Sequence, residues 1–537
     1  MKKNAFIPII VFSLFILFPF WYVIFLISNK YQLLNNPTAV YPITIALSLF
    51  LALFIDRVTN NKLSPDAKRI IQVIFSFSII SYAVYLFLIT WERYVNFISE
   101  AIDLVFFHQV IWQFSEFKIP YIWNLNQPLY PQWSQHFSPI LALLAPLYWI
   151  AHSEGLLLST QAIATLSGAI PIYLISKEYL HSKSIGLSLA FAYLSFGGLQ
   201  FGFAYGFHEI LFFPPLFLWS YYFYTSKNKK FYYLFIALSL LVKEEVVFIV
   251  FFWGLYLYFV KRDRQTAIIT MAMGALWGLI CFEIIFPIFN NGHGFGYWGQ
   301  YESFLSPAIV TNLFNTQVKI DMFLETFGQF SFLLFLFPPA VIIVIPSLLE
   351  KLLSSGIAQA NGAHYSAAIA AVTVVATIEA LSRIDKYKFV KKHVRQTSIF
   401  FAVLIFYFAM FSNVFFGYNG YSLIPAVQEY DQAKGPGAEN SQILDTLITQ
   451  IPLNAKVSAQ YQIAPHLNKY YKDLTIWPSM TGTEDFVIID TKLPPVLGAT
   501  SDDYNRAIDK MNTNKKYTLA FSSDGILAYR RNGYKLN

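Results

Sequence analysis

The chain has 537 residues, of which 56% are hydrophobic, 19% are aromatic and 13% are charged, with a mean hydropathy of +0.48. Because soluble proteins carry about 25% charged residues, this composition excludes an ordinary soluble fold and favours a protein whose helices are solvated by lipid. The net charge of +7 comes from short basic clusters between apolar segments, a membrane-protein pattern that argues against nucleic-acid binding, and the single cysteine excludes an intrachain disulfide and a thiolate metal cluster.

Long apolar runs recur over the first four hundred or so residues. About 20 apolar residues span the hydrocarbon core, so we expect about 11–13 transmembrane helices, the shorter ones tilted or packed inside protein. The first run is too long for a signal peptide and predicts a retained helix. The candidate spans are 5–27, 41–55, 70–90, 156–175, 185–199, 210–224, 231–242, 246–260, 267–289, 332–349, 365–381 and 398–416.

Basic clusters orient these spans, because Lys and Arg collect on the cytoplasmic side. The densest cluster lies at 383–395, and one crossing after it places the C-terminal part outside. We therefore expect a multi-pass plasma-membrane protein with a cytoplasmic N-terminus, an external loop at 91–135 and an external C-terminal domain.

Two segments do not fit a simple alternation of crossings. The apolar stretch 136–150 is expected to lie in the outer membrane face without crossing. The stretch 332–349 contains three prolines, which break helices. Either this stretch is re-entrant or the amphipathic segment 309–330 contributes a crossing.

The composition changes after residue 416, where polar and apolar residues begin to alternate. A helix is expected at 441–451 and strands at 456–459, 486–489, 517–521 and 526–530, and Asp502-Asp503 is typical of a solvated helix start. We therefore expect three parts. These are N-terminal transmembrane helices (1–90), a main membrane domain (91–416) and a small extracytoplasmic α/β domain (417–537).

Several ionisable residues lie at the expected outer ends of the spans, and such residues are functional candidates by default. Glu100 and Asp103 are three residues apart, so both carboxylates share one helix face. They could act as a general base or hold a divalent cation, Mg²⁺ or Mn²⁺, against a phosphate. The alternative is an acidic helix N-terminus stabilised by the helix dipole.

Further polar groups fall at the same expected depth. His136 stands where the chain re-enters the membrane, and His208-Glu209 lies at an outer helix–helix turn. A histidine there can donate to phosphate or move a proton, or it can simply cap a helix.

Two more clusters interrupt strongly apolar runs. Lys243-Glu244-Glu245 offers a point charge for a phosphate, or else a local ion pair. His364-Tyr365 begins the penultimate span and could equally be a helix cap.

The order of these motifs resembles an uncharacterised family of polytopic membrane proteins, the domain of unknown function 2079, over roughly residues 94–531. That family is similar in layout to the GT-C glycosyltransferases, which take a sugar from a polyprenyl-phosphate carrier on the outer membrane face. The motifs that carry the resemblance are Asp103-Leu104, Gln109, Trp112, His136-Phe137-Ser138-Pro139, Ala145-Pro146-Leu147-Tyr148, Phe207-His208-Glu209, Lys243-Glu244-Glu245, His364-Tyr365-Ser366-Ala367, the stretch 451–459, Ala464-Pro465-His466-Leu467 and the stretch 485–490.

The resemblance implies an all-α, GT-C-like membrane bundle and a polyprenyl-phosphate-linked sugar as partner. Asp103 would then be the base or metal ligand, His136, His208, Lys243 and His364 would stabilise phosphate, and the aromatic-rich span 212–224 would line the lipid groove. One alternative is a transporter or flippase for lipid-linked sugars, which needs polar residues near the midplane. Another is a non-catalytic membrane assembly protein, in which the polar groups would be scattered.

Overall fold

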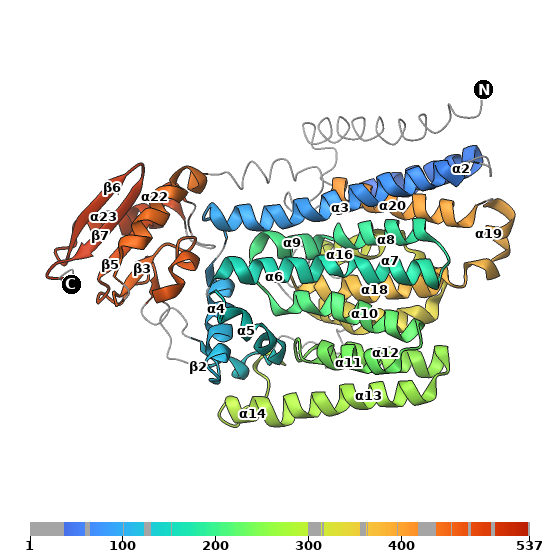
Figure 1. Cartoon of the computed structure of the whole chain (residues 1–537), viewed down its shortest axis with the longest axis horizontal. Helices are drawn as coiled ribbons and strands as arrows, with labels where there is room; N and C mark the ends of the chain where they lie inside the picture. Colours follow the sequence, from blue (N-terminus) through green and yellow to red (C-terminus); the bar gives the residue numbers. More distant parts are fainter. Residues whose placement is uncertain are drawn as a thin grey trace.

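The structure is a computed structural model that describes residues 37–59, 65–99, 101–122, 130–151, 153–298, 313, 316–354, 361, 364–394, 396–416, 436–452, 454–470, 474–493, 495 and 500–534. Within these ranges, long helices lie side by side in a bundle, and a small sheet domain lies at one end of it (Figure 1). We call this end the sheet-domain end and the opposite one the far end. The prediction of a helical membrane bundle followed by a small α/β domain is confirmed.

Every predicted span within the described residues coincides with a helix or a broken helix, and the first span, 5–27, lies outside them. The span at 332–349 is broken at its two adjacent prolines, as expected of residues that cannot continue a helix. The helices are α2 (Pro37–Thr59), α3 (Pro65–Val95), α6 (Glu154–Ser167), α7 (Ala169–Glu178), α8 (Lys183–Leu194), α9 (Gly197–Tyr205), α10 (Phe213–Thr225), α11 (Lys229–Leu240), α12 (Val246–Tyr256), α13 (Arg264–Leu279), α14 (Phe286–Phe289), α16 (Gln317–Gly328), α17 (Val341–Leu353), α18 (Ala367–Leu381), α19 (Lys388–His393) and α20 (Thr397–Phe416).

Four helices of the described chain are long and apolar enough to cross a membrane by themselves: Gln72–Val95, Glu154–Glu178, Arg264–Phe289 and His364–Leu381. The pair α8 and α9 forms a further span with a bend of 58°. The remaining apolar helices are shorter, so the expected total of about 11–13 crossings requires them as well.

Burial separates one central helix from the lipid-facing ones. Every residue of α18 is buried, and its alanines and valines let neighbouring helices approach closely. On the periphery, Phe77, Phe259 and Ile288 are each at least 65% exposed. Such apolar surface is costly in water but is the normal exterior of a helix in lipid.

One helix does not follow the bundle axis. The helix α4 (Ala101–Ser115) crosses the sheet-domain end, with η2 (Pro139–Leu144) and α5 (Ala145–Tyr148) beside it (Figure 1). His108 on α4 contacts the Tyr148 hydroxyl at 2.9 Å and the Glu154 carboxylate at 3.3 Å. These contacts fix α4 across the ends of the other helices, and the segment expected not to cross forms only short helices here.

The sheet domain has five strands in the order β4-β3-β5-β7-β6. Strand β3 pairs in parallel with β4 and with β5. Strand β7 pairs antiparallel with β5 and with β6, and a hairpin joins β6 to β7. The predicted strands are all present, and β4 was not predicted. The elements are α22 (Pro436–Gln450), β3 (Val457–Ala459), β4 (Leu474–Ile476), β5 (Phe486–Asp490), α23 (Ser501–Asn512), β6 (Tyr517–Ser523) and β7 (Ile526–Arg531).

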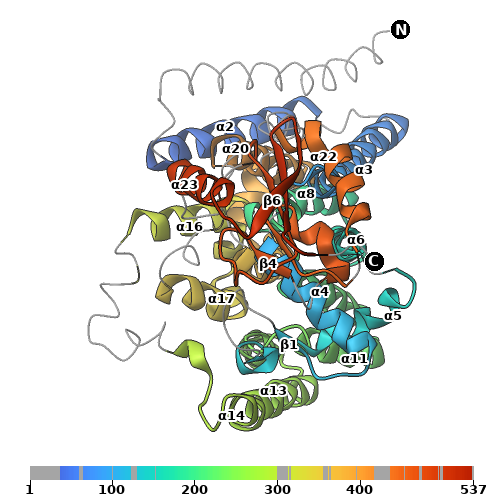
Figure 2. The ribbon, with the colours of Figure 1, turned by 90° about the vertical axis from the view of Figure 1, so that its left-hand side faces the viewer.

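The sheet domain docks on the bundle through a histidine. The His466 ring, in η13 (Ala464–Tyr470), stacks between Tyr94 and Phe97, with ring centroids 4.6 and 3.7 Å away. The segment η13 also packs against α4. Seen from this end, the sheet domain lies over the part of the bundle around α4, while α13 and α14 lie at the rim (Figure 2). The sheet domain therefore contacts the helix that carries Asp103.

Candidate functional site

Four connecting segments meet at the sheet-domain end of the bundle. They are the first turn of α4, the loop between α9 and η3 (Glu209–Phe212), the turn between α11 and α12, and η10 (His364–Ser366). A glycine allows α9 to approach η10 closely, because a Cβ on Gly198 would lie 2.4 Å from the Cβ of Ser366. No side chain fits there, so the start of α9 packs directly against η10.

A carboxylate and two imidazoles form the centre of the site. The Asp103 Oδ2 lies 3.9 Å from the His208 Nε2, and the His208 ring stacks on His364 with centroids 3.5 Å apart. The His208 side chain is 4% exposed, whereas that of Asp103 is 37% exposed. Burial, helped by the positive charge of Lys243, lowers the pKa of His208 to about 3. His208 is therefore a neutral hydrogen-bonding group, and Asp103 is the carboxylate that a substrate could reach.

Lys243 lies inside the same cluster. Its Nζ is 3.6 Å from Glu209 Oε1 and 3.6 Å from Glu245 Oε2, and it lies 5.9 Å from the centre of the Tyr365 ring. Both carboxylate distances are longer than a hydrogen bond. The two carboxylates thus compensate the positive charge of Lys243 without accepting a hydrogen bond from it. The N–H groups of Lys243 could therefore donate to a bound anion.

His136 and Glu244 join the re-entering segment to this cluster. The His136 Nδ1 lies 2.7 Å from Glu244 Oε1, and the backbone N–H of Phe137 donates to Glu244 Oε2 at 3.0 Å. The His136 ring also stacks on Tyr297, with centroids 4.9 Å apart. Glu244 therefore holds His136 beside the turn that carries Lys243.

The comparisons with known proteins agree with this architecture. A family model described as "Predicted membrane protein (DUF2079)" matches residues 93–528. The chain belongs to the DUF2079 family. No curated protein matches its sequence.

Two solved structures resemble this DUF2079 protein. The structure of ArnT from Cupriavidus metallidurans bound to undecaprenyl phosphate aligns with a TM-score of 0.52 and 10% identity, covering 85% of this chain and 97% of that one. The apo state of ArnT gives a TM-score of 0.46 and 9% identity, covering 84% and 98%. At this identity the first likeness shows the fold alone, so the DUF2079 protein has an ArnT-like GT-C fold, as its motifs indicated.

Two further residues of the site were not predicted from the sequence. Lys351 on α17 is buried and its Nζ lies 6.0 Å from the centre of the Tyr365 ring. Gln161 on α6 accepts from the backbone N–H of His208 at 2.6 Å and donates to the carbonyl of Gly206 at 2.9 Å. Both interrupt apolar runs, so the reasoning that singled out Lys243 could have found them.

Some of the expectations stay predictions. Glu100 lies outside the described residues. Among those residues, no group of three or more His, Cys, Asp and Glu side chains is arranged to hold a metal ion, and the expected Mg²⁺ or Mn²⁺ remains to be tested. In the span 212–224, expected to line a lipid groove, Phe217 and Tyr221 are buried against Trp253, whereas Trp219, Tyr222 and Tyr224 are partly exposed.

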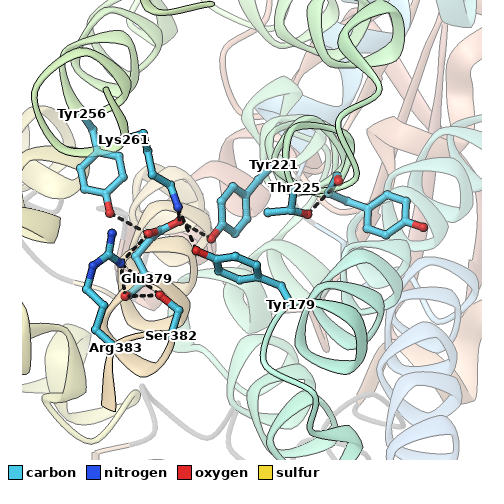
Figure 3. Close-up of polar contacts among 9 residues, drawn as sticks. Tyr179, Tyr221, Thr225, Tyr256, Lys261, Glu379, Ser382 and Arg383 are labelled. Carbon is cyan, nitrogen blue, oxygen red and sulfur yellow. Dashed lines mark hydrogen bonds and ion pairs between the residues drawn. The ribbon is translucent and has the colours of Figure 1, made fainter. Parts of the chain in front are cut away.

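A second polar cluster of the DUF2079 protein lies at the far end of α18 (Figure 3). The fully buried carboxylate of Glu379 accepts from the Tyr221 hydroxyl at 2.6 Å and the Tyr256 hydroxyl at 2.7 Å, and it pairs with Lys261 and Arg383, each at 2.8 Å. Both oxygens are satisfied by side chains from several helices. The cluster therefore ties the far ends of these helices together.

The two clusters are well separated. At a rise of 1.5 Å per residue, Glu379 lies about 22 Å along the helix from His364. The α18 residues between them are buried and apolar apart from two threonines, one of which bonds back to its own helix. The described part of α18 thus carries no polar path from one cluster to the other.

Proposed function

We propose that this protein is a GT-C-type membrane glycosyltransferase that moves a sugar from a polyprenyl phosphate to an acceptor hydroxyl on the outer membrane face. The observation that carries the proposal is the meeting of Asp103, His208, Lys243 and His364, from four separate segments, at one end of the bundle. The likeness of the fold to a protein solved with undecaprenyl phosphate supports the same class of donor. In this proposal the sheet-domain end faces outward.

The transfer requires a base near the acceptor. Asp103 is the partly exposed carboxylate of the cluster, so it would take the proton of the acceptor hydroxyl as that oxygen attacks the anomeric carbon. The bond from that carbon to the phosphate oxygen breaks, and the electron pair leaves with the polyprenyl phosphate. The charge that develops on the leaving phosphate is where positioned donors lower the barrier most.

Lys243 and His208 are the donors placed to stabilise that charge. Lys243 keeps its N–H groups unengaged by the two flanking carboxylates, and neutral His208 can donate one hydrogen bond. His136, held by Glu244, and His364, stacked on His208, complete the set. A phosphate bound here would also lie beside Tyr365 and Lys351.

The Glu379 cluster at the far end argues against the alternative of a transporter. A transported substrate needs polar groups that can exchange partners near the midplane. Glu379 is instead saturated by four side chains, and the buried, mostly apolar surface of α18 lies between it and the proposed site. This arrangement favours a site that opens on one side.

The test is transfer from a labelled polyprenyl-phosphate sugar in membranes that contain the Asp103→Asn variant. Loss of the base should lower the transfer rate by about 10²–10⁴-fold. Asp502→Asn, at an exposed helix start in the sheet domain, is the control and should leave the rate unchanged. Equal rates for wild type and Asp103→Asn would remove Asp103 from the mechanism. Chelation in the same assay tests the predicted Mg²⁺ or Mn²⁺.

A further inference from the structure

An apolar pocket of about 460 Å³ opens beside the C-terminal half of α4. It lies between α4, η1 (Gln132–Ser134) and the η2–α5 segment, and this volume is in the usual range for small-ligand sites. Its one charged lining residue, Lys118, forms an ion pair with Glu116. Its apolar lining includes Phe114, Phe117, Trp133, Ala142 and Trp149.

Two lining residues at the mouth of the pocket are exposed and apolar. Phe117 is 87% exposed and Trp149 is 62% exposed. Phe117 has φ of 57°, the left-handed conformation of a residue that ends a helix, and the Lys118 N–H donates to the Gln113 carbonyl at 2.9 Å. A hydrogen bond from Trp149 Nε1 to the Ser115 carbonyl, at 2.9 Å, holds the Trp149 ring 6.1 Å from that of Phe117. Such a rim suits contact with hydrocarbon.

A row of aromatic rings runs from the pocket toward the candidate site. The ring of Phe114 lies 6.1 Å from that of Trp133, which lies 5.2 Å from that of Phe137. The backbone of Phe137 donates to Glu244, next to Lys243 in the chain. An extended molecule with its polar end at Lys243 could therefore lay its apolar end along Trp133.

We propose that this pocket holds a segment of the isoprenoid chain of a polyprenyl phosphate whose phosphate lies at Lys243. The inference rests on the proposed function and adds a place for the lipid chain. An uncharged hydrocarbon fits a lining whose one cation is already paired. The rim residues let the rest of the chain pass into the bilayer.

The test is filling the pocket from an exposed position. Ala142→Trp inserts a ring into the pocket, and Leu143→Trp, the adjacent exposed residue that does not line it, is the matched control. Each purified full-length protein is placed in phosphatidylcholine nanodiscs, and its affinity for undecaprenyl phosphate and for the ten-carbon geranyl phosphate is measured. Ala142→Trp should lower the affinity for undecaprenyl phosphate at least tenfold and leave the affinity for geranyl phosphate unchanged. Leu143→Trp should change neither affinity.

The outcomes separate this inference from the proposed function. If wild type binds neither probe, the proposed function fails. If wild type binds undecaprenyl phosphate and Ala142→Trp binds it equally well, the pocket is not the site of the chain. If Ala142→Trp loses affinity for undecaprenyl phosphate and for geranyl phosphate to the same extent, the inference is also contradicted.

A second measurement needs no variant. A polyprenyl phosphate with a photoreactive diazirine on the isoprene units that follow its first ten carbons should label wild-type protein within 114–119 or 142–149. Labelling concentrated instead on α13, at the rim of the bundle, would overturn the proposal.

Discussion

Asp103 and His208 face each other from segments more than a hundred residues apart, with Oδ2 and Nε2 separated by 3.9 Å. That distance is longer than a hydrogen bond, so the two groups are neighbours and not a closed pair. One is partly open to solvent and the other is buried against His364. The pair therefore offers a base and a hydrogen-bond donor side by side.

Replacing His208 by Phe tests whether its nitrogen acts in transfer. A phenyl ring retains the stacking on His364 but removes the Nε2 beside Asp103. Loss of one hydrogen bond to a charged group costs about 1.5–3 kcal/mol, so the rate should fall by roughly 10–100-fold. His293→Phe, in an exposed loop, is the matched control. A variant with unchanged single-turnover rate would show that His208 only packs.

Replacing Lys243 by Met should affect stability and donor binding separately. Without its cation, the buried Glu209 carboxylate and the neighbouring Glu245 lose their compensating charge, which should destabilise the protein by about 3–5 kcal/mol. Adding Glu245→Gln removes one of these charges and should recover part of the melting temperature. Binding of undecaprenyl phosphate should stay weak in both variants. If the double variant regained binding, Lys243 would be a structural ion-pair partner alone.

Much of the fold follows from patterns in the sequence. Apolar runs predicted the spans, and the segments 517–521 and 526–530 predicted β6 and β7, because the period of hydrophobic residues is a local signal. The break in the span at 332–349 was visible in its prolines.

The site was harder to predict because its contacts join distant segments. Charged residues inside apolar runs identified Lys243 and His208, but no local pattern shows that Lys243 faces Tyr365 or that His208 stacks on His364. The span 212–224 illustrates the limit. Its aromatic side chains suit a lipid groove and a buried core equally well, and no local pattern shows that Phe217 and Tyr221 pack against Trp253.

The Glu379 cluster should contribute to stability and not to transfer. Glu379→Gln keeps the shape of the side chain but leaves Lys261 and Arg383 without their carboxylate, at a cost of about 3–5 kcal/mol. The melting temperature should fall, and Glu379→Gln combined with Lys261→Met should restore part of it. The transfer rate per folded molecule should be unchanged, since the cluster is about 22 Å from His364. Loss of function at an unchanged melting temperature would favour a path through the membrane.

The docking of the sheet domain should weaken in acid because of His466. Burial lowers the pKa of His466 to about 3 from 6.5, so the ring between Tyr94 and Phe97 is neutral. Between these values the unfolded chain binds a proton that the folded one does not, so stability falls as pH drops from about 6.5 toward 3, by at most about 1.4 kcal/mol per pH unit. His466→Phe keeps an aromatic ring between Tyr94 and Phe97 and removes the loss of stability caused by protonation of His466. Thermal melting from pH 7.5 to 4.5 should therefore fall more steeply for wild type than for the variant, and parallel curves would contradict the assignment.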